Sequence, residues 1–520
     1  MNRKNGIDQI KGKKKWDILV IGGGATGLGI ALEACTRGYQ TLLVEQSDFA
    51  KSTSSKSTKL VHGGVRYLAQ GNLKLVREAA VERGLLHKNA PDLVKNLEFI
   101  IPVYNWFDRI KYTIGLKLYD WVSGTLSLGP SIFINKKKVI QYLPTINHKN
   151  LVGGVLYHDG QFDDARLAII LAKKIYDEGG YAVNYMKVKS LRKCGDNITG
   201  AELLDMDDNS EYSVQAKVVV NATGVFSDDL LQMDRPEGHK MIAVSQGVHI
   251  VLDKKFLPGN QALMIPKTSD GRVLFVLPWN GKLLAGTTDT PVNKISLEPV
   301  PQEPEIDFIL ETVGAYLTEK PRREDVLSVF AGLRPLAAGE AGNQKTKEIS
   351  RSHKIIISPS KMFTMLGGKW TTYRKMGEDM VDKIETEFKW PATASITSKL
   401  SLTDNKNVAD KELPRSPTRE SDASNDLHLE VKLSERYSLF ESDITKAVKE
   451  EMAMTTDDVL SRRSRLLLID AAEALHIARE VSGIIAKLRG KEDSWINKDV
   501  ALFSELAENY LVTHVRQTDS

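Results

Sequence analysis

The feature that most restricts the fold of this chain is a glycine-rich turn that joins an apolar strand to a helix. Residues 16–46 read WDILVIGGGATGLGIALEACTRGYQTLLVEQ. This pattern predicts a strand over 18–21, a helix over 28–37 and a second strand over 41–44 that ends at Glu45. Strand, glycine turn, helix, strand and terminal acid make up the dinucleotide-binding fingerprint, so we expect a Rossmann-like α/β domain. The alternative is a glycine-rich turn without a ligand.

Each glycine in the fingerprint has a physical role. Gly22 permits the tight turn, Gly24 lets backbone N–H groups approach a pyrophosphate, and Gly27 lets the helix pack closely on the strand. The helix N-terminus offers unpaired donors and a positive dipole end, and Glu45 can accept from ribose hydroxyls. The fingerprint alone does not distinguish NAD from FAD.

Two later segments extend the same domain. Residues 214–224, VQAKVVVNATG, predict a buried strand that follows a small sheet over 182–206, and its end could lie beside the adenine half of the cofactor. Taken alone, the segment is better explained as an ordinary strand-end turn. Residues 355–376 predict two strands, over 355–357 and 362–366, followed by a Gly367-Gly368 turn and a helix, with Lys369 beside the turn. A flavin needs such a fixed positive charge near N1 and C2, whereas a surface turn lysine is the alternative.

The middle of the chain, residues 240–335, has short alternating segments that predict an antiparallel sheet, suited to a substrate platform. Before it, STSSKSTKLVHGGVRYL at 52–68 supplies small hydroxyl side chains that could cover a pyrophosphate or flavin. Basic residues recur at strand and turn ends: His249, Arg272, Arg334, Arg351 and Lys369. Each alone could be an ion-pair partner, but several together would suit a phosphate dianion.

Composition excludes several classes of protein. The chain has 520 residues, of which 42% are hydrophobic, so disorder is excluded as its main state. Its two cysteines cannot build a disulfide framework or a four-thiolate metal site, and we expect no metal. The net charge is +4, yet residues 1–15 hold six basic residues and one acidic residue. The rest is therefore nearly neutral, which argues against nucleic-acid binding.

The two ends of the chain and one aromatic segment bear on location. No apolar run is long enough to span a membrane, and the N-terminus has no secretory core. We interpret 1–15 as a basic tail that is either solvated or in contact with an anionic membrane. Residues 99–121 hold seven aromatic residues among basic ones, which suits either a bilayer interface or the core of the substrate domain. Residues 401–427 predict a linker, and 428–520 an all-helical C-terminal domain.

The sequence resembles the family of FAD-dependent, quinone-linked glycerol-3-phosphate dehydrogenases over residues 16 to about 510. The motifs that carry the resemblance are GGGATGLG, KSTKLVHGGVRYL, DGQFDDARL, NATGVFSD, AGLRPL and GGKWTTYRK. The resemblance implies a D-amino-acid-oxidase type of FAD domain with an antiparallel substrate domain and a helical C-terminal domain. We place the oxidoreductase domain at 16–400, with FAD-binding parts near 16–98, 155–240 and 355–395 and substrate-binding parts near 99–154 and 241–354.

The resemblance also implies site residues. His249, Arg334 and Lys369 are the expected catalytic residues, with His249 as candidate base and Arg334 as an alternative group that polarises the substrate oxygen. Substrate contacts are expected at Arg66, Tyr67, His249, Arg334, Arg351 and Lys369. FAD contacts are expected at Gly22, Gly24, Ala25, Thr26, Gly27, Glu45, Gln46, Ser54, Ser55, Thr58, Lys59, Leu60, His62, Gly63, Gly64, Val188, Ala222, Thr223, Gly224, Gly368, Lys369, Thr371 and Thr372.

The implied reaction is oxidation of sn-glycerol 3-phosphate to dihydroxyacetone phosphate by hydride transfer to FAD, with reoxidation by a respiratory quinone. A homodimer is expected, in the cytoplasm and peripherally attached to the inner face of the cell membrane. Three alternatives stay open at this point. They are an oxidase that uses oxygen on the same substrate, an amine or amino-acid oxidase of the same fold, and a flavin-bearing RNA-binding protein. A cluster of basic groups favours the phosphate substrate over an amino acid, for which one arginine would suffice.

Overall fold

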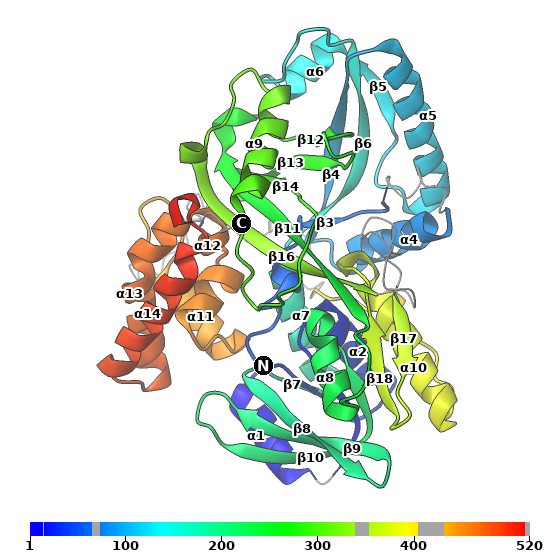
Figure 1. Cartoon of the computed structure of the whole chain (residues 1–520), viewed down its shortest axis with the longest axis vertical. Helices are drawn as coiled ribbons and strands as arrows, with labels where there is room; N and C mark the ends of the chain where they lie inside the picture. Colours follow the sequence, from blue (N-terminus) through cyan, green and yellow to red (C-terminus); the bar gives the residue numbers. More distant parts are fainter. Residues whose placement is uncertain (14, 65–72, 338–352, 404–430, 515–520) are drawn as a thin grey trace, which may run out of the picture.

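The computed structural model describes residues 1–13, 15–64, 73–337, 353–403 and 431–514 (Figure 1). It contains two sheets, one for each lobe of the oxidoreductase domain, and a group of C-terminal helices. The first sheet has the order β17-β18-β10-β1-β2-β7, and β8 and β9 extend from β10 as an antiparallel meander. Its strands are β1 (Trp16–Ile21), β2 (Thr41–Val44), β7 (Tyr181–Val183), β8 (Met186–Cys194), β9 (Asn197–Asp205), β10 (Glu211–Asn221), β17 (Lys354–Ile357) and β18 (Met362–Leu366).

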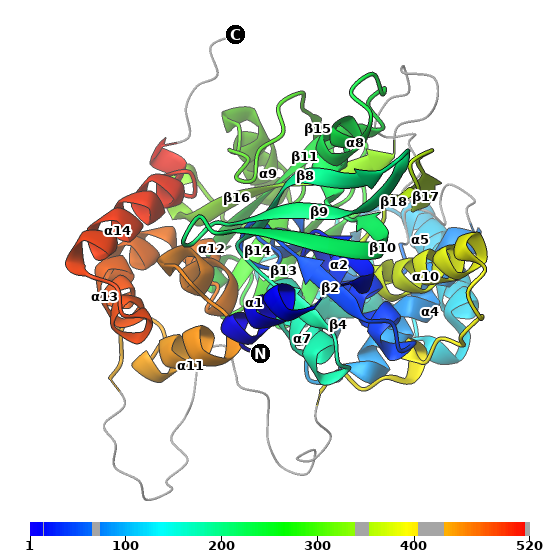
Figure 2. The ribbon, with the colours of Figure 1, turned by 90° about the horizontal axis from the view of Figure 1, so that it is seen from below.

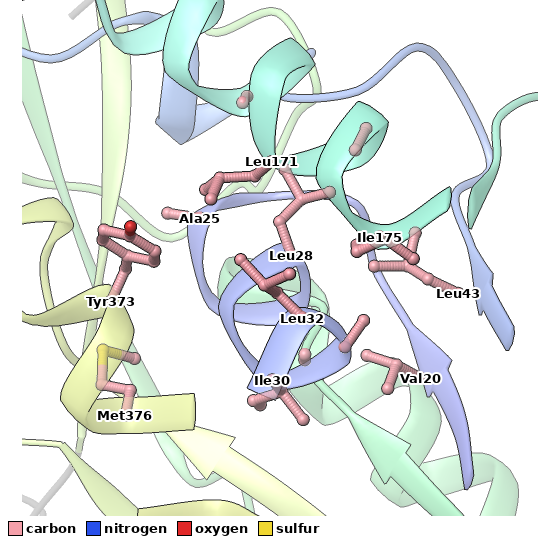
Figure 3. Close-up of a cluster of buried hydrophobic side chains, with 14 of the residues drawn as sticks. Val20, Ala25, Leu28, Ile30, Leu32, Leu43, Leu171, Ile175, Tyr373 and Met376 are labelled. Atoms are coloured by element: carbon pink, nitrogen blue, oxygen red, sulfur yellow. The ribbon is translucent and has the colours of Figure 1, made fainter. Parts of the chain in front are cut away.

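The centre of this first sheet is parallel, as the fingerprint predicts. Strands β18, β10, β1, β2 and β7 pair in parallel, and such a sheet needs cover on both faces. Helices α2 (Ala25–Thr36), α7 (Asp164–Asp177) and α10 (Tyr373–Phe388) cover one face. Figure 3 shows their contact: Leu28 and Leu32 of α2 lie between Leu171 of α7 and Met376 of α10. The other face packs against the β8–β9 meander. Figure 2, which views the molecule from below, shows β8, β9 and β10 side by side in front of the other strands.

The second sheet runs β15-β11-β14-β13-β12-β4-β6-β3, with β16 paired to β11 and β5 to β6. Its strands are β3 (Leu60–Val61), β4 (Val94–Val103), β5 (Ile132–Asn135), β6 (Gly153–Phe162), β11 (Ile242–Asp253), β12 (Ala262–Ile265), β13 (Leu274–Trp279), β14 (Lys282–Gly286), β15 (Thr290–Pro291) and β16 (Val326–Ala337). Helices α4 (Leu73–Asn89), α5 (Trp106–Ser123), α6 (Lys136–Tyr142), α8 (Ser227–Asp234) and α9 (Glu303–Tyr316) complete the two lobes. The predicted antiparallel sheet over 240–335 is present, since β11 pairs antiparallel with both β14 and β16.

The boundary between the two lobes differs from the predicted one. Strand β4 begins at Val94 and pairs antiparallel with β6 along its whole length, from Val94 opposite Phe162 to Val103 opposite Gly153. Residues 94–98 and 155–162, predicted as FAD-binding parts, therefore belong to the substrate sheet, as does β3. Long-range pairing decides this boundary, and no local signal in the sequence marks it.

Residues 3–12 form helix α1 (Arg3–Gly12), which corrects the prediction of a basic tail. The Asn2 side chain caps the helix, accepting from the N–H of Asn5. Ile10 is buried, and the guanidinium of Arg3 lies 2.7 Å from the carboxylate of Asp205. An ion pair and an apolar contact thus hold α1 against the β-meander. Among the described residues, no helix has the length and apolar character needed to cross a membrane.

The C-terminal helices pack directly on the substrate sheet. They are α11 (Glu441–Glu451), the π-helical turn η9 (Asp458–Arg463), α12 (Leu466–Ile469), α13 (Ala471–Arg489) and α14 (Asp493–Glu508). The Ser328 hydroxyl donates to the carbonyl of Leu467, and the N–H of Val329 donates to the carbonyl of Tyr510, each at 2.9 Å. The predicted helical domain is therefore present, and it shares a hydrophobic core with β16. Most of the predicted linker, from 404 onward, lies outside the described residues.

Candidate active site

A cavity of about 720 Å³ lies between the two lobes, at the carboxyl ends of β1, β2, β10 and β18. Cofactor sites in doubly wound sheets occupy this position, and their volumes are commonly about 300–1,000 Å³. Most of the predicted FAD residues line it: Gly22, Gly24, Ala25, Thr26, Glu45, Gln46, Ser54, Thr58, Leu60, His62, Val188, Ala222, Thr223, Gly224, Gly368, Lys369 and Thr371. Of the predicted catalytic residues, His249, Arg334 and Lys369 all line it. The structure therefore brings together residues that the sequence separates by more than 300 positions.

The glycine turn forms a cradle that side chains would fill. Gly22 has φ +113°, and a Cβ there would lie 2.6 Å from the carbonyl oxygen of Ala222. A Cβ on Gly27 would lie 1.8 Å from the carbonyl oxygen of Gly22, so α2 packs against the turn only with glycine at 27. Ser54 Oγ accepts from the N–H of Ala25 at 3.0 Å, which fixes the hydroxyl segment over the helix N-terminus. This cradle fits the pyrophosphate of a dinucleotide.

Glu45 is oriented as an acceptor at the end of β2. Its carboxylate accepts from the N–H of Gly23 at 2.6 Å and from the N–H of Ser47 at 2.9 Å. Burial raises the pKa of Glu45, and these two N–H bonds oppose that shift. The residue also lines the cavity, and the predicted contact of its remaining lone pairs with ribose hydroxyls stays a prediction.

Six residues predicted to contact FAD do not line the cavity: Gly27, Ser55, Lys59, Gly63, Gly64 and Thr372. Lys59 is fully buried, and its ammonium donates to the carbonyl of Ser55 at 2.6 Å and to Asp164 at 2.8 Å. The positive charge of Lys59 is therefore compensated by Asp164 within the protein. Gly63 and Gly64 follow a lining residue, and Gly27 supports the turn from behind. Within the hydroxyl segment, some residues therefore line the cavity and others face the core. The sequence motif alone does not show which residues do which.

His249 is placed as a neutral imidazole. It lies on β11 with its ring stacked on Phe330, and its Nε2 lies 2.8 Å from the Thr58 hydroxyl. Burial lowers the pKa of His249 well below its usual range, and the positive charges of Lys59 and Arg334 lower it further. An imidazole that stays unprotonated at neutral pH can accept a proton, which agrees with the predicted role of a general base.

Arg334 lies across the same strand pair and is oriented by the protein. Its guanidinium donates to Thr287 Oγ1 at 3.0 Å and lies 3.2 Å from the carboxylate of Asp289. A Cβ on Gly247 would lie 2.2 Å from the guanidinium, and one on Gly286 would lie 2.4 Å from the ring of His249. These two glycines make room for the two catalytic candidates. The two glycines lie in the segments QGVHI and AGTTD, but only the pairing of β11 with β14 and β16 shows their use.

Lys369 follows the Gly367-Gly368 turn, where φ is +72° and +91°. The next residue, Trp370, opens the short helix η6 (Trp370–Thr372), and its indole N–H donates to the carbonyl of Ser54 at 2.8 Å. The turn is thereby tied to the hydroxyl segment on the far side of the cavity. The positive charge of Lys369 thus lies at the cavity, which fits the requirement of a flavin.

Several functional positions lie elsewhere or were missed. Arg66, Tyr67 and Arg351 lie outside the described residues, so their roles stay predictions. Arg272 does not line the cavity, because its guanidinium pairs with Asp270. The lining also includes two lysines that are not among the predicted site residues, Lys51 and Lys56. Both pair with Glu298, so their charge is largely compensated within the protein.

Comparison with known proteins agrees with this geometry. The model of the family "FAD dependent oxidoreductase" matches residues 17–360, and that of the "C-terminal domain of alpha-glycerophosphate oxidase" matches 408–495. The mitochondrial glycerol-3-phosphate dehydrogenase of Schizosaccharomyces pombe is 36% identical over 96% of this chain and 88% of its own. The human mitochondrial enzyme of the same name is 37% identical over 94% of this chain and 72% of its own.

The chain belongs to the FAD-dependent glycerol-3-phosphate dehydrogenase family.

A crystal structure of the glycerol-3-phosphate dehydrogenase from Bacillus halodurans, complexed with FAD, matches 99% of this chain and 99% of its own with a TM-score of 0.75 and 26% identity. The L-α-glycerophosphate oxidase of Mycoplasma pneumoniae, at 17% identity and a TM-score of 0.57 over 74% of this chain and 97% of its own, shares the fold. The predicted fold class and cofactor are thereby confirmed. This dehydrogenase uses FAD and oxidises glycerol 3-phosphate. The amino-acid oxidase and RNA-binding alternatives are set aside.

Proposed function

We propose that this enzyme oxidises sn-glycerol 3-phosphate to dihydroxyacetone phosphate and passes the electrons to a respiratory quinone at a membrane surface. When bound, FAD supplies the hydride acceptor for substrate C2. The residues of the chain supply the other functions. His249 takes the proton of the C2 hydroxyl. Arg334 binds the negative charge of the substrate phosphate, and Lys369 provides the positive charge that a flavin requires. The observation that carries the proposal is that these three residues line one cavity with the glycine cradle.

The proton step rests on the state of His249. Its Nε2 contacts the Thr58 hydroxyl, which fixes the ring, and its pKa is lowered by burial and by neighbouring positive charge. The positive charge of Arg334, which lines the cavity, also favours binding of a phosphate dianion. This one charge thus helps both to bind the substrate anion and to keep the base unprotonated.

The phosphate role of Arg334 is tested by Arg334→Ala. Loss of two charge-assisted hydrogen bonds, at about 1.5 kcal/mol each, lowers kcat/KM for glycerol 3-phosphate about 100-fold. Arg272→Ala is the matched control, because Arg272 lies on the same lobe outside the cavity and should leave kcat/KM unchanged. An Arg334→Ala enzyme that prefers glycerol 3-phosphate over glycerol as strongly as the wild type contradicts the phosphate role.

The choice of quinone rather than oxygen is tested with the purified enzyme. We expect anaerobic glycerol 3-phosphate to bleach the yellow protein, a ubiquinone or menaquinone analogue to restore the colour within the time of turnover, and air to restore it slowly. Rapid reoxidation by air with stoichiometric hydrogen peroxide would instead support the oxidase alternative.

Membrane attachment is proposed through helix α5. Its outer side exposes apolar side chains, of which Trp106, Phe107 and Trp121 are 65%, 76% and 77% exposed. Large apolar patches on a soluble surface are rare outside interaction sites, and aromatic residues beside basic ones suit a bilayer interface. Other aromatics of the predicted segment are core, since Phe99 and Tyr119 are buried. The proposed location is the inner face of the cell membrane. The proposed homodimer rests on the family resemblance and is measured by light scattering.

A further inference from the structure

Helix α5 has a second, buried side that reaches toward the cofactor cavity. Tyr119 and Leu116 on this side are 2% and 1% exposed, whereas Trp121 on the other side is 77% exposed. The same helix therefore contacts solvent on one face and the interior of the enzyme on the other. In Figure 1, α5 lies at the outer edge of the substrate lobe, above α4.

The Tyr119 hydroxyl is the centre of a buried hydrogen-bond network. It accepts from the N–H of Gly63 at 2.9 Å and from the guanidinium of Arg83 at 2.8 Å, and it donates to Asp159 at 3.1 Å. Arg83 also pairs with Asp159 at 2.6 Å. Burial and the charge of Asp159 raise the pKa of Tyr119 well above its usual range, so the phenol keeps the proton that it donates. All of its hydrogen-bonding capacity is thus used by residues on α4, on β6 and in the segment after β3.

Gly63 is held in place by this network and adjoins the cavity. A Cβ at Gly63 would lie 2.4 Å from the Tyr119 oxygen, so the phenol fits only against glycine. The preceding residue, His62, lines the cavity, and its N–H lies 3.4 Å from Thr371 Oγ1 at the opposite wall. The backbone from His62 to Gly63 is therefore fixed between the Lys369–Thr371 side of the cavity and helix α5.

We propose that Tyr119 is a positioning residue, which sets the His62–Gly63 backbone against the cofactor by accepting the Gly63 N–H and so ties that wall of the site to α5. Tyr119 does not line the cavity, so its effect passes through Gly63. The inference uses the FAD cavity and does not depend on quinone or membrane binding.

The test compares Tyr119→Phe with Tyr112→Phe in the FAD-loaded enzyme. Both changes remove one phenol oxygen from α5, but Tyr112 does not belong to the network around Gly63. We expect Tyr119→Phe to change the visible circular dichroism of bound FAD, to weaken FAD binding at least fivefold, and to lower kcat about tenfold with KM for glycerol 3-phosphate within twofold. Tyr112→Phe should match the wild type in all these measurements.

A second variant covers the case in which Tyr119→Phe does not fold. Arg83→Lys keeps a positive charge beside Asp159 but removes the planar donor to Tyr119, so it should give a smaller dichroism change of the same sign. The inference is overturned if Tyr119→Phe, or Arg83→Lys in its place, has the dichroism and FAD affinity of Tyr112→Phe. Wild-type enzyme that binds FAD but is not bleached by glycerol 3-phosphate would contradict the proposed function and leave the dichroism test intact.

Discussion

At the scale of single residues, each fingerprint glycine removes a clash with a different neighbour. A Cβ on Gly27 would meet the carbonyl of Gly22 in the same turn, whereas Cβ atoms on Gly22 and Gly24 would meet Ala222 and Ser54, which are distant in the sequence. The glycine spacing therefore predicts the turn, but not these two distant partners. Arg334 was found by resemblance, yet its orientation by Asp289 and Thr287 was not predictable. Those partners are brought close only by the pairing of β11 with β14 and β16. The contact between Thr58 and His249 was not predictable either, because the two residues are far apart in the sequence.

The charge of Lys59 leads to a prediction about pH. This charge disfavours the imidazolium form of His249, so Lys59→Met should raise the pKa of His249 and move the acid limb of kcat/KM to higher pH. Methionine suits the buried position, and Asp164 keeps its ion pair with Arg465. The measurement is the ratio of variant to wild-type kcat/KM from pH 5 to 8, in which ionisation of the substrate phosphate cancels. We expect this ratio to fall as the pH falls; a ratio independent of pH contradicts the assignment of His249.

At the scale of elements, the sequence predicts the bounds of continuous apolar strands, whereas it does not predict the amphipathic helices α1 and α5. The strands over 41–44 and 362–366 have the predicted bounds, because buried parallel strands are continuous apolar runs. The sequence predicts a basic tail where helix α1 forms, because lysines dominate the composition there. The contacts that hold the helix are made by Arg3 and Ile10, which the composition does not single out. The aromatic segment at 99–121 combined two structures, the end of β4 in the core and α5 at the surface. The sequence shows that the segment is aromatic, but only the tertiary structure shows which of its residues are buried and which are exposed.

Helix α5 allows a direct test of membrane binding. The double substitution of Phe107 and Trp121 by glutamate removes two exposed aromatics, each able to contribute about 1.5–3 kcal/mol on burial in a bilayer. We expect at least a hundredfold weaker binding to vesicles of phosphatidylglycerol and phosphatidylcholine, measured by flotation. Turnover with a soluble dye should stay unchanged, because these side chains do not line the cavity. Leu502→Glu, on the exposed side of α14, is the control. Equal flotation of all three proteins would reject α5 as the binding surface.

At the scale of the whole molecule, the C-terminal helices are joined to the FAD lobe by buried charge. Arg462 of η9 contacts Asp48, Asp457 and Asp458 at 2.6, 3.0 and 2.7 Å. Arg463 contacts Asp48 as well, at 2.7 Å. Asp48 lies in the loop after β2, close to Glu45, so these arginines reach the loop beside the cofactor cradle. The sequence predicts a helical domain at this end of the chain. It does not show that two arginines of this domain neutralise the buried carboxylate of Asp48 in the first lobe.

Removal of Arg462 should therefore affect the cofactor as well as stability. Arg462→Met leaves buried carboxylates without a shared partner, which costs about 3–5 kcal/mol. We expect earlier thermal release of FAD, followed by flavin fluorescence, and a lower Tm; Arg479→Met, which removes an exposed arginine near Asn497, should change neither. The sign of the pH effect follows from the carboxylates. Without Arg462 the pKa values of these carboxylates in the folded protein rise relative to the wild type, so the destabilisation is full at pH 7 and shrinks as the pH falls through the raised values. A deficit that is constant between pH 7 and pH 5 would mean that lost packing, rather than unbalanced charge, separates the variant from the wild type.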